Sequence, residues 1–175
     1  TLLRSMKPDL SIIVPAFEEE ERLGLSIEKI LTFTQASEMR TELIVVDDGS
    51  RDSTSDVARD AASRFGEDTI NVVRYEPNRG KGFAVKTGLL KARSDIALFS
   101  DADLSTPIQE MGKLIDPIRA GHYDLTFGSR ALDRTLIGAH QPWRREQGGK
   151  VFNLVVRVLT GMPFWDTQCG FKAFN

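Results

Sequence analysis

The chain has 175 residues, and its 23 lysines and arginines nearly balance 25 aspartates and glutamates, for a formal net charge of -2. This length is sufficient for one domain with a substantial core, and the near-neutral balance lacks the basic excess of a nucleic-acid-binding protein. A single cysteine, Cys169, excludes an intramolecular disulfide framework and favours a reducing compartment.

Apolar runs and amphipathic segments alternate along the chain. The first run, residues 10–14, is closed by Pro15 and is typical of a buried strand. Further strands are expected over residues 43–46, 70–75, 96–99 and 125–127. Helices are expected over residues 18–33, with acidic residues in the first turn, and over 53–65, 82–92 and 107–120. This alternation predicts one α/β domain over residues 1–175, with a largely parallel sheet flanked by helices.

The last part of the chain has a different pattern. Residues 131–142 lack periodicity and predict a flexible loop, whereas residues 143–160 predict a helix whose second half is apolar on most sides. No apolar run approaches the roughly 18 residues that would span a bilayer. The chain starts without methionine, and residues 171–175 are typical of an interrupted strand. We therefore expect a C-terminally truncated fragment of a longer protein.

The sequence Asp101-Ala102-Asp103 follows the predicted strand 96–99. Ligands of an open α/β sheet collect at the carboxyl ends of its strands. Two carboxylates one residue apart on a turn can share Mg²⁺ or Mn²⁺, which prefer oxygen ligands and are often held by one or two carboxylates plus substrate phosphates. Alternatively, Asp101 caps the turn and Asp103 is solvated. Acidic residues at neighbouring strand ends favour the metal site, in which Asp103 is catalytic.

Other strand ends supply candidates for nucleotide binding. Asp47 and Asp48 can accept hydrogen bonds from a base or ribose, although Asp-Gly-Ser is also an ordinary turn sequence. Phe17 can stack on a base or simply pack, and Glu19 can bond a ribose or lie in the first turn of its helix. Lys81 stands between two glycines, where the backbone can approach a phosphate closely; the alternative is a solvated lysine at a helix start.

Four segments together resemble family 2 glycosyltransferases, which have the GT-A fold. They are VPAFEE at residues 14–19, VVDDGS at 45–50, NRGKG at 78–82 and DAD at 101–103. Within that family, GSR at 128–130 and DTQCGFK at 166–172 resemble the dolichyl-phosphate glucosyltransferases and their prokaryotic relatives, with polyprenyl-phosphate mannosyltransferases as close cousins. The resemblance implies an inverting, metal-dependent hexosyltransferase that uses a nucleoside-diphosphate sugar.

The resemblance also implies roles for single residues. The nucleoside would be held by Pro15, Phe17, Glu19 and one or both of Asp47 and Asp48; the metal and diphosphate by Asp101, Ala102 and Asp103; and the phosphates or acceptor would lie near Arg130. The sequence departs from the family at position 18, where Glu18 replaces the usual asparagine. It also lacks the C-terminal membrane-associated portion of many relatives. We expect the full-length protein to work at the cytoplasmic side of a membrane.

The chemistry of the acceptor decides which side chains the reaction needs. A phosphate monoester needs no general base, because its second pKa is about 6 and it is largely dianionic at neutral pH. Cations that could orient it are Arg130, Arg144, Arg145 and Lys172, and the apolar residues 151–159 could rest against a lipid or membrane. A saccharide hydroxyl would need a base, for which Asp166 is the candidate.

The expected reaction is therefore transfer of glucose from UDP-glucose to a polyprenyl or dolichyl phosphate. One alternative is a family 2 enzyme with a hydroxyl acceptor, and another is a non-catalytic module that binds sugar nucleotides. A signalling receiver domain is excluded by the order of its motifs, because here the acid pair follows the second strand and the later Asp-x-Asp would have no role.

Overall fold

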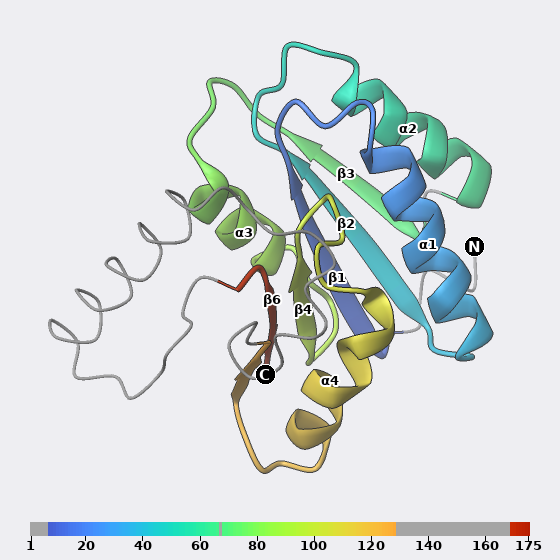
Figure 1. Cartoon of the computed structure of the whole chain (residues 1–175), viewed down its shortest axis with the longest axis vertical. Coiled ribbons are helices and arrows are strands. Elements are labelled where there is room, and N and C mark those ends of the chain that lie inside the picture. Colours follow the sequence, from blue (N-terminus) through green and yellow to red (C-terminus); the bar gives the residue numbers. More distant parts are fainter. Residues whose placement is uncertain (1–6, 67, 129–168) are drawn as a thin grey trace, which may run out of the picture.

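The computed structural model describes residues 7–66, 68–128 and 169–175. In these residues one six-stranded sheet has the strand order β3-β2-β1-β4-β6-β5 (Figure 1). The strands are β1 (Leu10–Ala16), β2 (Thr41–Asp47), β3 (Ile70–Arg74), β4 (Ala97–Ser100), β5 (Leu125–Phe127) and β6 (Phe171–Phe174). The helices are α1 (Leu23–Ala36), α2 (Thr54–Phe65), α3 (Lys81–Leu89) and α4 (Met111–Arg119), the last preceded by the short 3-10 helix η2 (Ile108–Glu110).

The parallel part of the sheet is centred on β1, which pairs in parallel with β2 and β4, while β2 pairs in parallel with β3. Strand β6 runs antiparallel to both of its neighbours, β4 and β5. The expected α/β fold with a largely parallel sheet is confirmed, with β6 as an antiparallel insertion. The strand order reverses between β1 and β4, and such a switch point is where open α/β sheets bind ligands.

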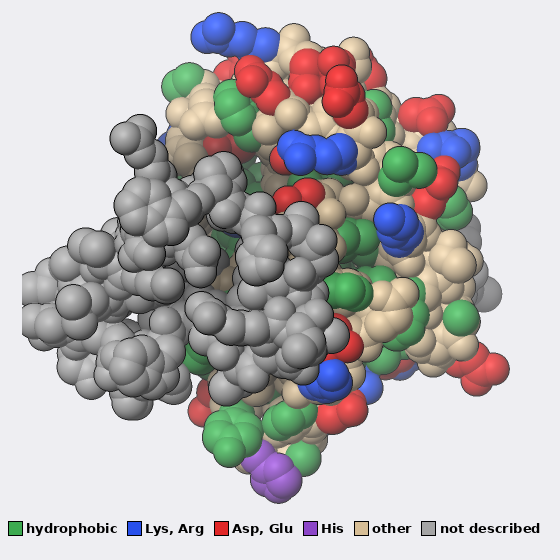
Figure 2. All heavy atoms as spheres, viewed as in Figure 1, with side chains coloured by type: hydrophobic (Ala, Val, Ile, Leu, Met, Phe, Trp, Pro, Cys, Tyr) green, Lys and Arg blue, Asp and Glu red, His purple; other side chains and the backbone are tan. Residues whose placement is uncertain are grey.

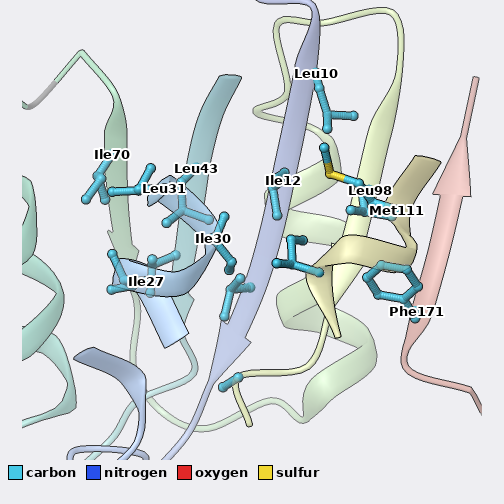
Figure 3. Close-up of a cluster of buried hydrophobic side chains, with 14 of the residues drawn as sticks. Leu10, Ile12, Ile27, Ile30, Leu31, Leu43, Ile70, Leu98, Met111 and Phe171 are labelled. Carbon is cyan, nitrogen blue, oxygen red and sulfur yellow. The ribbon is translucent and has the colours of Figure 1, made fainter. Parts of the chain in front are cut away.

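The two faces of the sheet are covered differently. Alternate residues of β1, including Leu10 and Ile12, pack with α1, α2 and α4 in the larger core cluster, part of which Figure 3 shows. The opposite face, with Ile13, packs against α3 in a smaller cluster. Gly88 of α3 lies so close to β1 that a Cβ there would stand 2.4 Å from Ile13 Cγ2. This contact sets α3 tightly against the strand that leads into the switch point.

The expectation of a helix from residue 18 was wrong at its start, because α1 begins at Leu23 and has no acidic residue in its first turn. Glu18 has a φ of 54°, a left-handed conformation that a right-handed helix cannot contain. The backbone N–H groups of Glu18 and Glu19 donate instead to Ser50 Oγ and Thr54 Oγ1, at 3.0 and 2.8 Å. The acidic segment is therefore a loop that hydrogen bonds tie to the region after β2.

The positive φ accounts for the asparagine that family members usually carry at position 18, and not for the glutamate that stands here. Asparagine tolerates the left-handed region better than glutamate does, because its short polar side chain can hydrogen-bond locally. We expect Glu18→Asn to raise the free energy of unfolding by about 0.5–1 kcal/mol, since the left-handed form costs ordinary L-residues roughly 1–2 kcal/mol. Urea denaturation checks this. The matched control is Glu21→Asn, which removes the same charge at a position without a positive φ; equal shifts in both variants would refute the strain argument.

Several expectations fall on residues that the structure does not describe. The predicted loop at 131–142 and helix at 143–160 lie outside the described residues, and so do Arg130, Arg144, Arg145 and Asp166. Among the helices that are described, none has both the length and the apolar character needed to cross a membrane.

Candidate functional site

A cleft of about 870 Å³ opens at the carboxyl ends of β1, β2 and β4, at the switch point of the sheet. Most of the candidate site residues from the sequence analysis line this cleft, and they come from four separate segments of the chain. These lining residues are Pro15, Phe17, Glu19, Asp48, Lys81, Asp101, Ala102 and Asp103. Figure 2 shows acidic side chains gathered at the upper edge of the molecule, over the loops that follow β1 and β2.

The end of β1 forms one wall of the cleft. Pro15 is the penultimate residue of the strand, and Phe17, just beyond it, keeps 43% of its surface exposed. An aromatic ring held at a cleft with this much free surface can stack on a planar ligand. Glu19 pairs with Arg22 at 2.9 Å, and both side chains line the cleft. This wall therefore offers one flat apolar surface and one carboxylate whose charge is already partly balanced.

The two aspartates after β2 have different environments. Asp47 is fully buried, and its Oδ1 accepts a hydrogen bond from the Ser50 N–H at 2.9 Å, so it closes the turn. Its Oδ2 lies 3.7 Å from Nε of Arg74. Asp48 lines the cleft, and its Oδ1 accepts a hydrogen bond from the Arg79 N–H at 2.8 Å. Both residues are buried, at 0% and 2% exposure, but Asp48 is the one of the two that lines the cleft, and Asp47 closes the turn beside it.

Aromatic packing supports the cleft from the β3–α3 side. The Arg79 guanidinium lies 3.5 Å from the centroid of the Phe83 ring, which packs edge-on against Tyr75 with centroids 5.1 Å apart. Burial raises the pKa of the Tyr75 phenol, and the neighbouring Asp48 carboxylate adds to the effect. Tyr75 therefore stays neutral at physiological pH and places no further negative charge beside Asp48.

The turn after β4 carries the Asp-x-Asp motif. Asp101, Ala102 and Asp103 all line the cleft, and Ala102 also belongs to the larger core cluster, so that it anchors the turn. Asp103 is exposed, and its Oδ1 accepts hydrogen bonds from the N–H and hydroxyl of Ser105, at 2.9 and 2.7 Å. Asp101 Oδ1 lies 2.5 Å from Lys81 Nζ. Both carboxylates are thus presented on one turn, next to the start of α3.

Gly170 lines the cleft, and no individual role was predicted for it from the sequence. A Cβ at this position would lie 2.0 Å from Asp101 Oδ2 and 2.3 Å from Cγ, so glycine leaves room for the carboxylate in its present position. The backbones are joined there as well, because the Asp101 N–H donates to Gly170 O at 3.1 Å. The neighbouring Cys169 is buried beside the cleft. The only sequence signal was the place of both residues within the DTQCGFK segment.

The residues of the cleft fit a divalent cation. Asp101 Oδ1 is buried, and its contact among the described residues is the ion pair with Lys81 Nζ at 2.5 Å. Among those same residues, no three carboxylate, histidine or cysteine side chains gather into a metal-binding group. A cation here would have two hard carboxylate ligands at most and would take the others from phosphate and water, which is the usual arrangement for Mg²⁺.

The cleft has a negative charge balance. Its described lining holds two cationic side chains, Arg22 and Lys81, and four carboxylates, a net charge of -2; the carboxylates are Glu19, Asp48, Asp101 and Asp103. An anionic diphosphate would be repelled by this lining alone. A divalent cation bound to the carboxylates would offset that repulsion.

Comparisons with known proteins agree with this geometry. Residues 11–164 match the family described as Glycosyl transferase family 2. The dolichyl-phosphate beta-glucosyltransferases of Homo sapiens and Drosophila melanogaster are 34% and 36% identical, over 95% of this chain and 54% of each relative. The chain therefore spans about half the length of these relatives.

Among solved structures, glucosyl-3-phosphoglycerate synthase from Mycobacterium tuberculosis in complex with Mn²⁺ and UDP-glucose superposes with a TM-score of 0.67. It is 22% identical, with 99% of this chain and 59% of that chain covered. This similarity shows a common fold, the GT-A fold.

Proposed function

The chain belongs to glycosyl transferase family 2, and on that premise we propose that it is a hexosyltransferase that moves glucose from UDP-glucose to a polyprenyl or dolichyl phosphate. The observation that carries the proposal is the cleft at the switch point of the sheet. It brings together an exposed aromatic ring, two carboxylates that could bind a metal ion, and Lys81 at the start of α3. The names of the human and fly relatives support the choice of acceptor and sugar.

Different residues of the described part of the chain would contact different parts of the sugar-nucleotide donor. Phe17 would stack on the base, Asp48 would accept hydrogen bonds from the nucleoside, and the start of α3 with Lys81 would face the diphosphate. Asp101 and Asp103 would hold Mg²⁺ or Mn²⁺. When bound, that ion would neutralise the charge that develops on the nucleoside diphosphate as it leaves.

The transfer we propose is a single inverting displacement. An oxygen of the acceptor phosphate attacks the anomeric carbon from the side opposite the diphosphate. A new carbon–oxygen bond forms as the bond to the diphosphate breaks, and the electron pair leaves with the nucleoside diphosphate. No proton has to be removed from a dianionic phosphate. Arg130 would orient the acceptor, a role that rests on the family resemblance. Asp166 would not be required as a base, because the acceptor is already dianionic.

The test supplies radiolabelled UDP-glucose to the full-length protein in detergent, with dolichyl phosphate and Mn²⁺ or Mg²⁺. We expect the label in an organic-extractable, acid-labile product that requires the metal and the lipid phosphate. Label found only in water-soluble saccharide, with Asp166 essential, would establish the hydroxyl-acceptor reaction instead. Nucleotide binding without transfer or donor hydrolysis would identify a binding module. We also propose that the full-length protein works at the cytoplasmic face of a membrane, which fractionation of cells would test.

Phe17→Ala should weaken binding of UDP about five- to hundredfold, because stacking of an aromatic ring on a base contributes roughly 1–3 kcal/mol. Isothermal titration calorimetry in the presence of Mn²⁺ measures the affinity. The matched control is Leu25→Ala, which removes another exposed apolar side chain that does not line the cleft. If both variants bound UDP as the parent protein does, Phe17 would be a packing residue only.

A further inference from the structure

The ammonium group of Lys81 is bound to the same carboxylate that the proposed metal would use. We propose that Lys81 is a built-in competitor of the divalent cation at Asp101, and that the arrival of a diphosphate removes this competition. The inference rests on the proposed function. It adds a coupling mechanism, in which binding of the metal and binding of the nucleotide each raise the affinity for the other.

The position of Asp101 makes the competition direct. Its Oδ1 is buried and has Lys81 Nζ at 2.5 Å. On the other side, Gly170 fits so closely that a Cβ there would stand 2.0 Å from Oδ2. Gly170 thus leaves the carboxylate room to lie beside Lys81, whose ammonium already holds Oδ1. A metal ion that binds Oδ1 must displace Lys81.

The Lys81 side chain, in contrast, is largely exposed to solvent. It is 56% exposed, against 23% for Asp101, and its Nζ lies 5.4 Å from the centroid of the Phe99 ring. Lys81 is also the first residue of α3, where the positive end of the helix dipole disfavours a cation. The ion pair with Asp101 offsets that cost. A diphosphate at the start of α3 would offer Lys81 a second anionic partner.

This exchange predicts a specific thermodynamic pattern. Without nucleotide, Mn²⁺ has to break the Lys81–Asp101 pair, so its affinity is reduced. With nucleotide bound, Lys81 pairs with the phosphates and the carboxylate is available to the metal. Coupling between two ligands is reciprocal, so Mn²⁺ tightens UDP binding by the same factor as UDP tightens Mn²⁺ binding.

The test compares the parent protein with Lys81→Met, and with Lys86→Met as a control that removes an exposed lysine of the same helix outside the cleft. Free Mn²⁺ is measured by electron paramagnetic resonance during titration, with and without UDP. Without UDP, Lys81→Met should bind Mn²⁺ roughly fivefold more tightly than the parent, the scale of a partly exposed ion pair. With UDP present, the variant should bind UDP more weakly, and the coupling factor should shrink.

A higher affinity for Mn²⁺ together with a lower affinity for UDP in Lys81→Met distinguishes a competitor of the metal from other roles of Lys81. Unchanged Mn²⁺ affinity without UDP would overturn the inference, and so would a weaker affinity, since Lys81 would then only hold Asp101 in place. The gain should disappear in an Asp101→Asn background, and its persistence there would also overturn the inference. If neither UDP nor GDP bound to the parent protein with Mn²⁺, the proposed function would fail, whereas the nucleotide-free titration would still decide the role of Lys81.

Discussion

Asp103→Asn should lower metal-dependent sugar transfer about a hundredfold or more, because loss of even an outer-shell partner of a metal site typically costs roughly 10- to 100-fold. Asparagine is nearly isosteric, and its Oδ1 can still accept the two hydrogen bonds from Ser105 that Asp103 accepts at 2.9 and 2.7 Å. The turn should therefore persist while one negative charge is lost. Initial rates at a fixed UDP-glucose concentration, measured over a range of Mn²⁺ concentrations, check this.

The control for Asp103→Asn is Asp60→Asn, which neutralises an exposed carboxylate on α2 that does not line the cleft. Its transfer rate should match that of the parent, and both variants should unfold at urea concentrations close to the parental value. A parental rate for Asp103→Asn at limiting Mn²⁺ would remove Asp103 from the metal site. In that case Asp101 would be the only candidate ligand on the turn.

The expected elements of the fold followed from local patterns, because the apolar runs that fill β1, β2 and β4 are contiguous in sequence. Their carboxyl ends meet at one edge of the sheet. Phe17, Asp48 and Asp101 could therefore be predicted to share one ligand-binding site without any knowledge of contacts. The start of α1 was missed for a conformational reason. Glu18 has a positive φ, and a run of glutamates before an apolar periodicity gives no sign of it.

Other features depend on contacts between distant segments. Whether Asp47 or Asp48 faces the cleft is set by the turn, in which Asp47 Oδ1 accepts the Ser50 N–H and Oδ2 faces Arg74. The pattern Asp-Asp-Gly-Ser permits either arrangement. In the same way, the antiparallel insertion of β6 brings Gly170 beside Asp101, 69 positions earlier in the chain. No periodicity or spacing near Gly170 indicates that neighbour.

Gly170→Ala should destabilise the protein by about 1–3 kcal/mol, the usual cost of forcing an extra carbon into a packed site, and should also lower transfer strongly. A Cβ would stand 2.0 Å from Asp101 Oδ2, and β6 cannot easily retreat, because Ser100 and Phe171 are paired next to it. The carboxylate would have to rotate instead, away from Lys81 and from the proposed metal position. Urea denaturation gives the stability, and Mn²⁺ titration gives the loss at the metal site.

The decisive control is a double-mutant cycle with Asp101→Ala. If the cost of the new methyl group arises from its clash with the Asp101 carboxylate, then Gly170→Ala should be nearly neutral in the Asp101→Ala background, where the clashing atoms are gone. Gly112→Ala serves as a second control, because a Cβ there would be no closer than 3.7 Å to Asp116 Oδ2 and the position lies on α4 outside the cleft. Gly170→Ala could instead cost the same stability in the parent protein and in the Asp101→Ala variant. That result would show that the fold requires the glycine backbone at position 170, and not the absence of a side chain beside Asp101.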